Sequence, residues 1–197
     1  MKHFSETSPA AEKVVDAAEG LVQQHGYNGF SYDDIARLIG IKKPGIHHHF
    51  PTKAELVTVV AQRYTHRFRE RLLRIDGTHA KAADKLAAYA DLFAQTYAQD
   101  RRLCVCGMLG AEADALPPAV AAEVTVFFRS NLDWLTQVVQ QGQASGQFHS
   151  QTDAKTHAFV FLSVLEGAML VGRGLEAEAG EVGPQTAATS LINSLRA

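Results

Sequence analysis

The chain has 197 residues and a formal net charge of −2, and 46% of its residues are hydrophobic against 20% charged. This is the balance of an ordinary globular protein long enough for a full hydrophobic core. We expect no signal peptide and no membrane-spanning helix, because the apolar stretch at 158–172 is short and is broken by Ser163 and Glu166. The two cysteines do not make a disulfide framework, which favours a reducing, cytoplasmic setting.

The charge is unevenly distributed along the chain. Residues 1–75 hold eleven Lys and Arg against eight Asp and Glu, whereas residues 76–197 hold eight against thirteen. Six of the nine histidines also lie in the first part. A mildly basic N-terminal part on a mildly acidic body is typical of a nucleic-acid-binding head on an effector body, although an excess this small can also arise by chance.

Three short helices are predicted before residue 50. Ser8-Pro9 supplies an N-cap and a proline at the first helical position, and Gly26 ends the first helix. Ser31 caps the second helix, with Asp34 three residues later as in a capping box. The second helix ends at Gly40, and a short third helix is predicted from Ile41 through about His49.

The remainder of the chain is also predicted to be helical. Thr52 and Glu55 form another capping pattern, which opens a long helix to about Ile75. Few β-branched residues alternate along the chain, so a sheet is not expected. The predicted fold is therefore all-α, with a helix-turn-helix head at 1–55 and a helical effector-binding and dimerisation domain at 56–197. Further helices are predicted over 79–98, 101–115, 118–145, 152–172 and 184–196, with a loop at 173–183.

The segment around the third helix has the features of a DNA-recognition element. Lys42 and Lys43 precede a single apolar anchor, Ile46, so cationic side chains can contact phosphates or base edges while the helix packs inward. Ser31 and Thr52 open the helices on either side, and helix N-termini bind phosphate well. The sequence therefore predicts a helix-turn-helix that binds double-stranded DNA.

The same segment resembles the TetR family of bacterial transcriptional regulators. The resemblance covers about residues 10–60 and implies a ligand-binding, dimerising helical body after the head. The matching residues are Gly26-Tyr27, Ser31, Ile35-Ala36, Gly40-Ile41, His47-His48-His49-Phe50 and Lys53.

Two departures from the family pattern lie in the third helix. His47 stands where the family has a tyrosine, and Pro44-Gly45 replaces a Gly-Thr pair. The operator sequence therefore cannot be inferred from relatives. The residues predicted to contact DNA are Ser31, Lys42, Lys43, Gly45, His47, His48, His49, Thr52 and Lys53.

The three adjacent histidines do not predict a metal site. Consecutive helical positions point in different directions, so these side chains are poor chelators within one chain. We favour contacts to the DNA backbone or packing at the turn, and we expect neither a metal nor a cofactor.

Cys104 and Cys106 have two interpretations. Asp100 is a candidate cap for a helix starting near Arg101-Arg102, which would place Cys104 near its first turn and favour the thiolate. The simpler interpretation is that both cysteines are small core residues. The run from Cys104 to Glu112 resembles the matching helix of the electrophile- and oxidant-sensing branch of the family, which makes Cys104 and Cys106 candidate sensors.

Two further residue sets are predicted for the body. A ligand pocket is expected among aromatic and polar side chains, and a homodimer is expected to form through the last two helices. The pocket candidates are Phe68, Phe93, Tyr97, Met108, Glu112, Phe128, Trp134 and Glu166. The dimer-interface candidates are Phe161, Leu165, Met169, Leu191 and Leu195.

These features favour a homodimeric repressor that leaves a palindromic operator when a small-molecule inducer or an electrophile acts on the body. The alternative is a helical small-molecule or lipid-binding protein of the same fold that no longer binds DNA. An enzyme is not expected, because the sequence carries no nucleophile elbow, His-Glu-x-x-His motif, phosphate loop or Cys-x-x-Cys pair.

Overall fold

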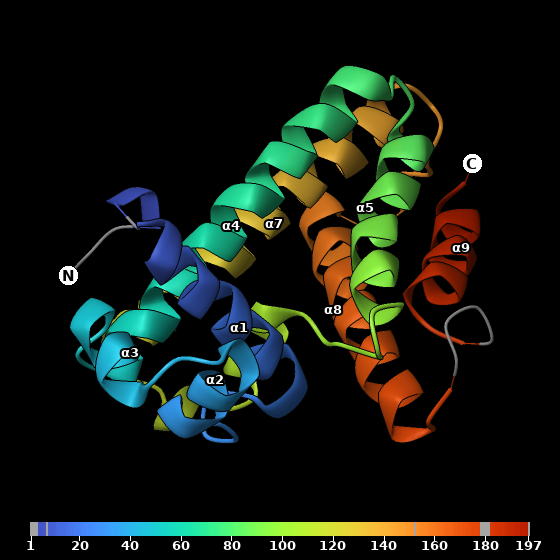
Figure 1. Cartoon of the computed structure of the whole chain (residues 1–197). Coiled ribbons are helices and arrows are strands. Elements are labelled where there is room, and N and C mark those ends of the chain that lie inside the picture. Colours follow the sequence, from blue (N-terminus) through green and yellow to red (C-terminus); the bar gives the residue numbers. More distant parts are fainter. Residues whose placement is uncertain (1–3, 7, 152, 178–181, 197) are drawn as a thin grey trace. The chain divides into compact units, whose positions relative to one another are not determined.

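The computed structural model describes residues 4–6, 8–151, 153–177 and 182–196. Across these residues the regular structure is helical and contains no strand, which confirms the predicted all-α class (Figure 1). The α-helices are α1 (Pro9–His25), α2 (Tyr32–Ile39), α3 (Lys43–His49), α4 (Lys53–Thr78), α5 (Ala82–Tyr97), α6 (Val105–Gly110), α7 (Pro118–Ala144), α8 (Ala154–Gly174) and α9 (Pro184–Leu195).

The chain forms two compact units. The first contains Met1–Phe68 and Val105–Phe127, and the second contains Arg69–Cys104 and Phe128–Ala197. The first unit thus combines α1 to α3 with the start of α4, α6 and the start of α7. The two units are not separated at a single point in the sequence, because each unit combines two segments that are far apart in the chain.

The first helix begins and ends as its sequence predicts. The Ser8 hydroxyl accepts a hydrogen bond from the Ala11 backbone N–H at 3.3 Å, and Pro9 takes the first helical position. Gly26 follows the last turn with φ of 74°, a left-handed value that an L side chain rarely adopts. One face of α1 is therefore held in register for packing against α2, α3 and α6.

The pair α2–α3 is built around a small buried cluster. Ile35 and Ile46 are fully buried, and Phe50 is buried directly after α3. The Tyr32 hydroxyl donates a hydrogen bond to the Phe50 carbonyl at 2.8 Å, which connects the start of α2 to the end of α3. Because α3 has only seven residues, tertiary packing rather than its own hydrogen bonds must hold it in place.

Charged side chains fasten α1 to the first half of α4. The Arg63 guanidinium lies 2.7 Å from Asp16 and 2.9 Å from Glu19, and Arg67 also pairs with Glu19. Arg63 and Glu19 are both largely buried, so the pair that they form is screened less than a surface ion pair. The predicted cap of α4 is confirmed, since the Thr52 hydroxyl accepts from the Glu55 N–H at 3.2 Å.

The helix predicted over 101–115 is wrong in its extent. Asp100 and Arg101 adopt left-handed φ values of 58° and 51°, which no α-helix tolerates, so Asp100 does not cap a helix at this point. The chain instead forms a turn, and α6 begins only at Val105. Cys104 therefore lies just before α6, and a short 3-10 turn at Ala113–Ala115 follows this helix.

In the second unit, α5, α8 and α9 pack against one another. The helix α8 is long and apolar enough to cross a membrane by length and composition alone, contrary to the expectation from the sequence. One side of it, including Phe161, Leu165 and Met169, is buried within the protein. A core helix of a folded protein can have the same length and apolar composition as a membrane-spanning helix. The predicted loop at 173–183 joins α8 to α9, and residues 178–181 lie outside the described part of the chain.

Replacing Ile46 with alanine should destabilise the first unit by about 2–4 kcal/mol, because a fully buried side chain leaves a cavity when it is truncated. The matched control is Ile41→Ala, since the Ile41 side chain is 38% exposed. Urea unfolding at one fixed protein concentration measures both variants. Equal stability of the two variants would contradict the assignment of Ile46 as the anchor of α3.

Candidate DNA-binding and sensor sites

The start of α3 presents an exposed cationic surface. Lys42 is the N-cap residue, and Lys42, Lys43 and Gly45 are all exposed. A Cβ atom at Gly45 would have no atom within 4 Å, so the backbone here is open to close approach. The Lys43 ammonium pairs with Asp33 at 2.8 Å, an exposed contact that other partners can replace at little cost. This leaves Lys42 as the more available cation.

The three histidines have different surroundings. The His47 ring lies 4.8 Å from the Tyr32 ring, and its Nδ1 is 3.3 Å from the Pro51 carbonyl oxygen. His48 is exposed, and its ring meets the His49 ring edge-on at 5.2 Å. The described residues hold no cluster of three or more metal-ligating side chains. His47 thus combines a packing role with an exposed position at the end of α3.

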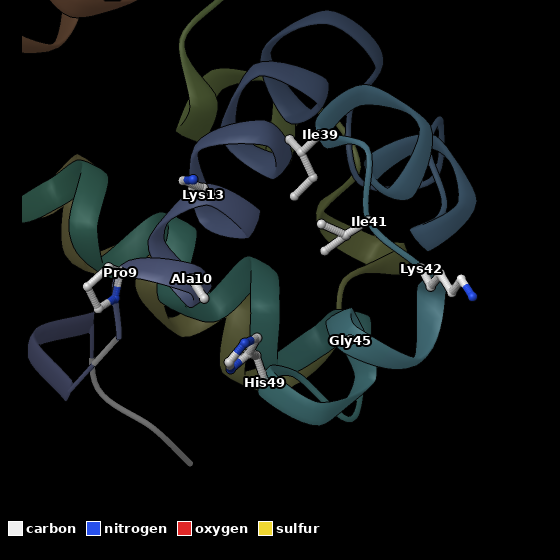
Figure 2. A pocket seen from close by; sticks show the side chains of 8 residues that line it. All are labelled: Pro9, Ala10, Lys13, Ile39, Ile41, Lys42, Gly45 and His49. Atoms are coloured by element: carbon white, nitrogen blue, oxygen red, sulfur yellow. The ribbon is translucent and has the colours of Figure 1, made fainter.

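A groove lies between the start of α1 and the α2–α3 pair (Figure 2). It has a volume of about 470 Å³, and three of its side chains, Lys13, Lys42 and His49, carry nitrogen groups. No pattern in the sequence indicated Lys13, because it lies on a different helix from the predicted site residues. The groove is lined by Pro9, Ala10, Lys13, Ile39, Ile41, Lys42, Gly45 and His49.

The predicted capping residues are engaged in their own helices. Both the backbone N–H and the hydroxyl of Ser31 donate to the Asp34 carboxylate, at 2.8 and 2.7 Å. These hydrogen bonds lower the pKa of Asp34, the side-chain bond contributing most. Because the pKa is lowered on folding, this cap weakens as pH falls through the folded-state value.

Lys53 points inward rather than into solvent. Its ammonium donates to the Phe30 carbonyl and lies 4.0 Å from the Phe30 ring centroid and 4.9 Å from that of Tyr27. Burial lowers its pKa, while the Glu112 charge acts in the opposite direction. The structure thus gives Lys53 a role in holding the turn between α1 and α2, and its contact with DNA stays a prediction.

Glu112 holds the same turn from the other side. Its carboxylate accepts hydrogen bonds from the Tyr27 N–H at 2.7 Å, from the Asn28 N–H at 3.1 Å and from the Asn28 side-chain amide at 2.5 Å. A Cβ at Gly26 would lie only 2.0 Å from a Glu112 oxygen. The carboxylate predicted to line a ligand pocket therefore holds the turn after α1, a role that no local sequence pattern indicates.

A buried polar cluster occupies the second unit. The Cys104 thiol hydrogen-bonds to the Glu166 carboxyl group, whose Oε1 atom is buried without a partner. The Tyr89 hydroxyl donates to the Asn131 side-chain oxygen at 2.9 Å, and the Tyr89 ring stacks on Trp134 at 5.5 Å. Burial raises the pKa of Glu166 to about 7 and also raises that of Tyr89, which feels the Glu166 charge.

The cluster includes residues that the sequence did and did not single out. Cys104, Trp134 and Glu166 were predicted site residues, whereas the partnership of Tyr89 with Asn131 has no sequence signature because it joins two helices. The Trp134 indole N–H donates to Asp76 at 2.8 Å. Both cysteines are buried, and no disulfide joins them.

The other pocket candidates are divided between the two units. Phe68, which is buried, and Met108 belong to the first, while Phe93, Tyr97 and Phe128 belong to the second. The Tyr97 hydroxyl donates to the Ala177 carbonyl at 2.9 Å and lies close to Gly172. Tyr97 therefore connects α5 to the end of α8.

The residues predicted for the dimer interface need correction. Phe161, Leu165, Met169 and Leu195 are at most 4% exposed within their own chain, so a partner subunit cannot pack on them, and Leu191 is only partly exposed. Phe161, Leu165 and Met169 follow one another at intervals of four residues along α8, and they lie on its buried face. Large apolar side chains on the exposed face of α8 are Phe159, Leu170 and Val171, each more than 60% exposed.

A short helix with an exposed cationic start, anchored by one buried residue beside a capped helix, is the arrangement found in helix-turn-helix DNA-binding proteins. The family "Bacterial regulatory proteins, tetR family" matches residues 14–60, and the family "Tetracyclin repressor-like, C-terminal domain" matches residues 82–182. The chain belongs to the TetR family of bacterial transcriptional regulators.

Individual relatives agree with this assignment. A TetR-family regulator from Agrobacterium tumefaciens has 30% identity and a TM-score of 0.89, covering 95% of this chain and 98% of its own. The transcriptional regulator AcuR of Cereibacter sphaeroides is 25% identical over 84% of this chain and 77% of its own. The negative regulator IcaR of Staphylococcus aureus is 38% identical over 45 residues, 23% of this chain and 24% of its own.

Changing Glu112 to glutamine should lower the free energy of unfolding by about 1–3 kcal/mol, because an amide nitrogen then faces backbone donors that it cannot accept from. The matched control is Asp114→Asn, an exposed carboxylate in the following turn. Thermal unfolding and amide hydrogen exchange at Tyr27 and Asn28 measure the effect. Unchanged protection of these two amides in the Glu112 variant would contradict the role assigned to this carboxylate.

Proposed function

We propose that this protein is a cytoplasmic homodimeric repressor that binds a palindromic operator and is released by an inducer or by modification of Cys104. The observation that carries the DNA-binding part is the exposed, cationic start of α3 on the buried Ile46 anchor. The family assignment supports the regulatory part.

In this proposal, different side chains at and near α3 contact different parts of the DNA. Lys42, Lys43 and Lys13 contact phosphates, and His47 and His48 contact the backbone, His47 at the position where the family has a tyrosine. Gly45 lets the backbone of α3 approach base edges closely, since nothing lies above it. The contact between Lys43 and Asp33 is exchanged for a phosphate contact on binding.

The proposed dimer uses α8 and α9, which pack together within the chain. The exposed Phe159, Leu170 and Val171 on α8 supply apolar area for a second copy, and paired helices from two copies make a four-helix interface. Two heads about 34 Å apart then fit successive major grooves of DNA. Release follows when the inducer or the modified thiol favours a dimer whose heads are differently spaced.

The double substitution of Lys42 and Lys43 by alanine should weaken binding to the protein's own upstream DNA at least tenfold. It should also lower the slope of log K against log salt by about one per lost phosphate contact. Lys81→Ala, at the exposed start of α5, is the matched control. A gel-shift titration at several salt concentrations measures both effects. Wild-type protein that binds no DNA under any condition would favour the ligand-binding alternative.

Changing Cys104 to serine should leave operator affinity unchanged but abolish release by an electrophile. Cys106→Ser is the matched control, because Cys106 is equally buried and lies within α6. Release is measured as loss of the gel-shifted complex after treatment with acrylamide. A Cys104 variant that is still released would make Cys104 a core residue, while the DNA-binding part of the proposal would stand.

A further inference from the structure

Glu166 is an unusual carboxylic acid for the interior of a helical unit. It lies on α8, and its Oε1 atom is buried without a hydrogen-bond partner. A buried carboxylate normally requires a cation or several donors, because removing the charge from water is costly. At Glu166, the hydrogen bond with the Cys104 thiol favours the charged carboxylate.

The other groups around this carboxyl group come from two helices. On α5, the Tyr89 hydroxyl lies close enough to Glu166 and Cys104 for their charges to oppose its ionisation. This hydroxyl donates a hydrogen bond to the Asn131 side-chain oxygen on α7 at 2.9 Å. Trp134, also on α7, stacks on the Tyr89 ring. Tyr89 and Asn131 therefore satisfy each other, while Glu166 keeps an acceptor atom open beside the thiol.

The surroundings of Cys104 do not favour a standing thiolate. Arg101, a neighbour expected from sequence to stabilise the thiolate, donates instead to the Glu176 carbonyl at 2.8 Å. A carboxylate next to the sulfur disfavours a second negative charge. A thiol in this position must therefore lose its proton during the attack rather than before it.

We propose that Glu166 is the proton acceptor for Cys104 when this thiol adds to a small, uncharged α,β-unsaturated carbonyl compound. This inference rests on the proposed sensor role of Cys104. The ring of Tyr89, whose ionisation is opposed by Glu166 and Cys104, packs against the rings of Trp134 and Phe161. An aromatic environment of this kind suits an uncharged reactant. Glu166 does not bond to the reactant, and it acts by general-base catalysis.

The proposed step is balanced without a further reagent. The Cys104 sulfur forms a bond to the β-carbon, and the thiol proton passes to the Glu166 carboxylate. The electron pair of the carbon–carbon double bond moves to the carbonyl group as an enolate, which then takes the proton back from Glu166 at its α-carbon. The product is a neutral thioether, nothing is oxidised or reduced, and Glu166 is again a carboxylate.

The proposal predicts a specific pH dependence. If Glu166 accepts the proton, the rate follows the fraction of ionised Glu166, so it rises with pH and levels off above about 7. A thiol that reacts only through free thiolate would instead keep gaining rate above about pH 8.5, the ordinary pKa of cysteine. The two mechanisms therefore differ in the position of the inflection.

The experiment uses the full-length protein with Cys106→Ala, so that one thiol is followed. Acrylamide is the probe, and intact-mass spectrometry gives the labelling rate between pH 5.5 and 9.5. We expect an inflection near pH 7 for Glu166, and at least a tenfold lower rate at pH 7 with no such inflection in Glu166→Gln. Glu166→Asp should keep an inflection near neutral pH, and Asp133→Asn, an exposed carboxylate on α7, should match the parent.

Three results would overturn the proposal. They are a faster reaction in Glu166→Gln, an inflection above pH 8 that this variant shares with the parent, and no labelling of Cys104 at all. A folding control accompanies the rates, because the raised pKa makes ionisation of Glu166 unfavourable in the fold. The Glu166→Gln variant should therefore gain in Tm relative to the parent as pH rises from 5 to 8. Loss of acrylamide response in Cys104→Ser together with an unchanged Glu166→Gln profile would retain the sensor and reject only the proton acceptor.

Discussion

The turn between α1 and α2 depends on the Glu112 carboxylate. This group accepts three N–H donors from Tyr27 and Asn28, and the left-handed Gly26 provides the space that it fills. Two backbone amides beyond the end of a helix would otherwise need water or another acceptor. The direction in which the chain leaves α1, and hence the position of α2, is therefore set by a residue more than eighty positions later in the chain.

Lys53 completes this arrangement from the start of α4. Its ammonium bonds to the Phe30 carbonyl, lies over the Phe30 and Tyr27 rings, and feels the Glu112 charge. On the opposite end of the same helix pair, Arg63 joins α4 to α1 through Asp16 and Glu19. The first half of α4 thus holds α1 and its following turn, while α3 packs against α1 and α2, with Ile46 and Phe50 buried.

The features that could be predicted from the sequence are those that depend on residues close together in the chain. The caps at Ser8, Ser31 and Thr52 and the anchor Ile46 each depend on residues within one or two turns, and all four are confirmed. Long-range partners were not predictable, because no spacing rule connects Glu112 to Asn28 or Tyr89 to Asn131. The turn that replaces the start of the helix predicted over 101–115 was not predicted either. Asp100 and Arg101 adopt left-handed φ values there, and no glycine marks the position in the sequence. The apolar residues of α8 were visible in the sequence, but apolar content does not distinguish side chains that pack in the core from side chains that would face a second copy.

The two acids predicted for the pocket, Glu112 and Glu166, show why burial alone does not define a site. Glu112 accepts three hydrogen bonds, so removal of this carboxylate leaves three donors without their acceptor and weakens the fold. Glu166 has the Cys104 thiol beside it and an oxygen left without a donor, so its charge costs free energy, and burial moves its pKa toward neutrality. A carboxylate of the first kind serves to hold a turn, whereas one of the second kind gains by taking up a proton. Of the two, Glu166 is therefore the acid suited to proton transfer, and the adjacent thiol is the available proton donor.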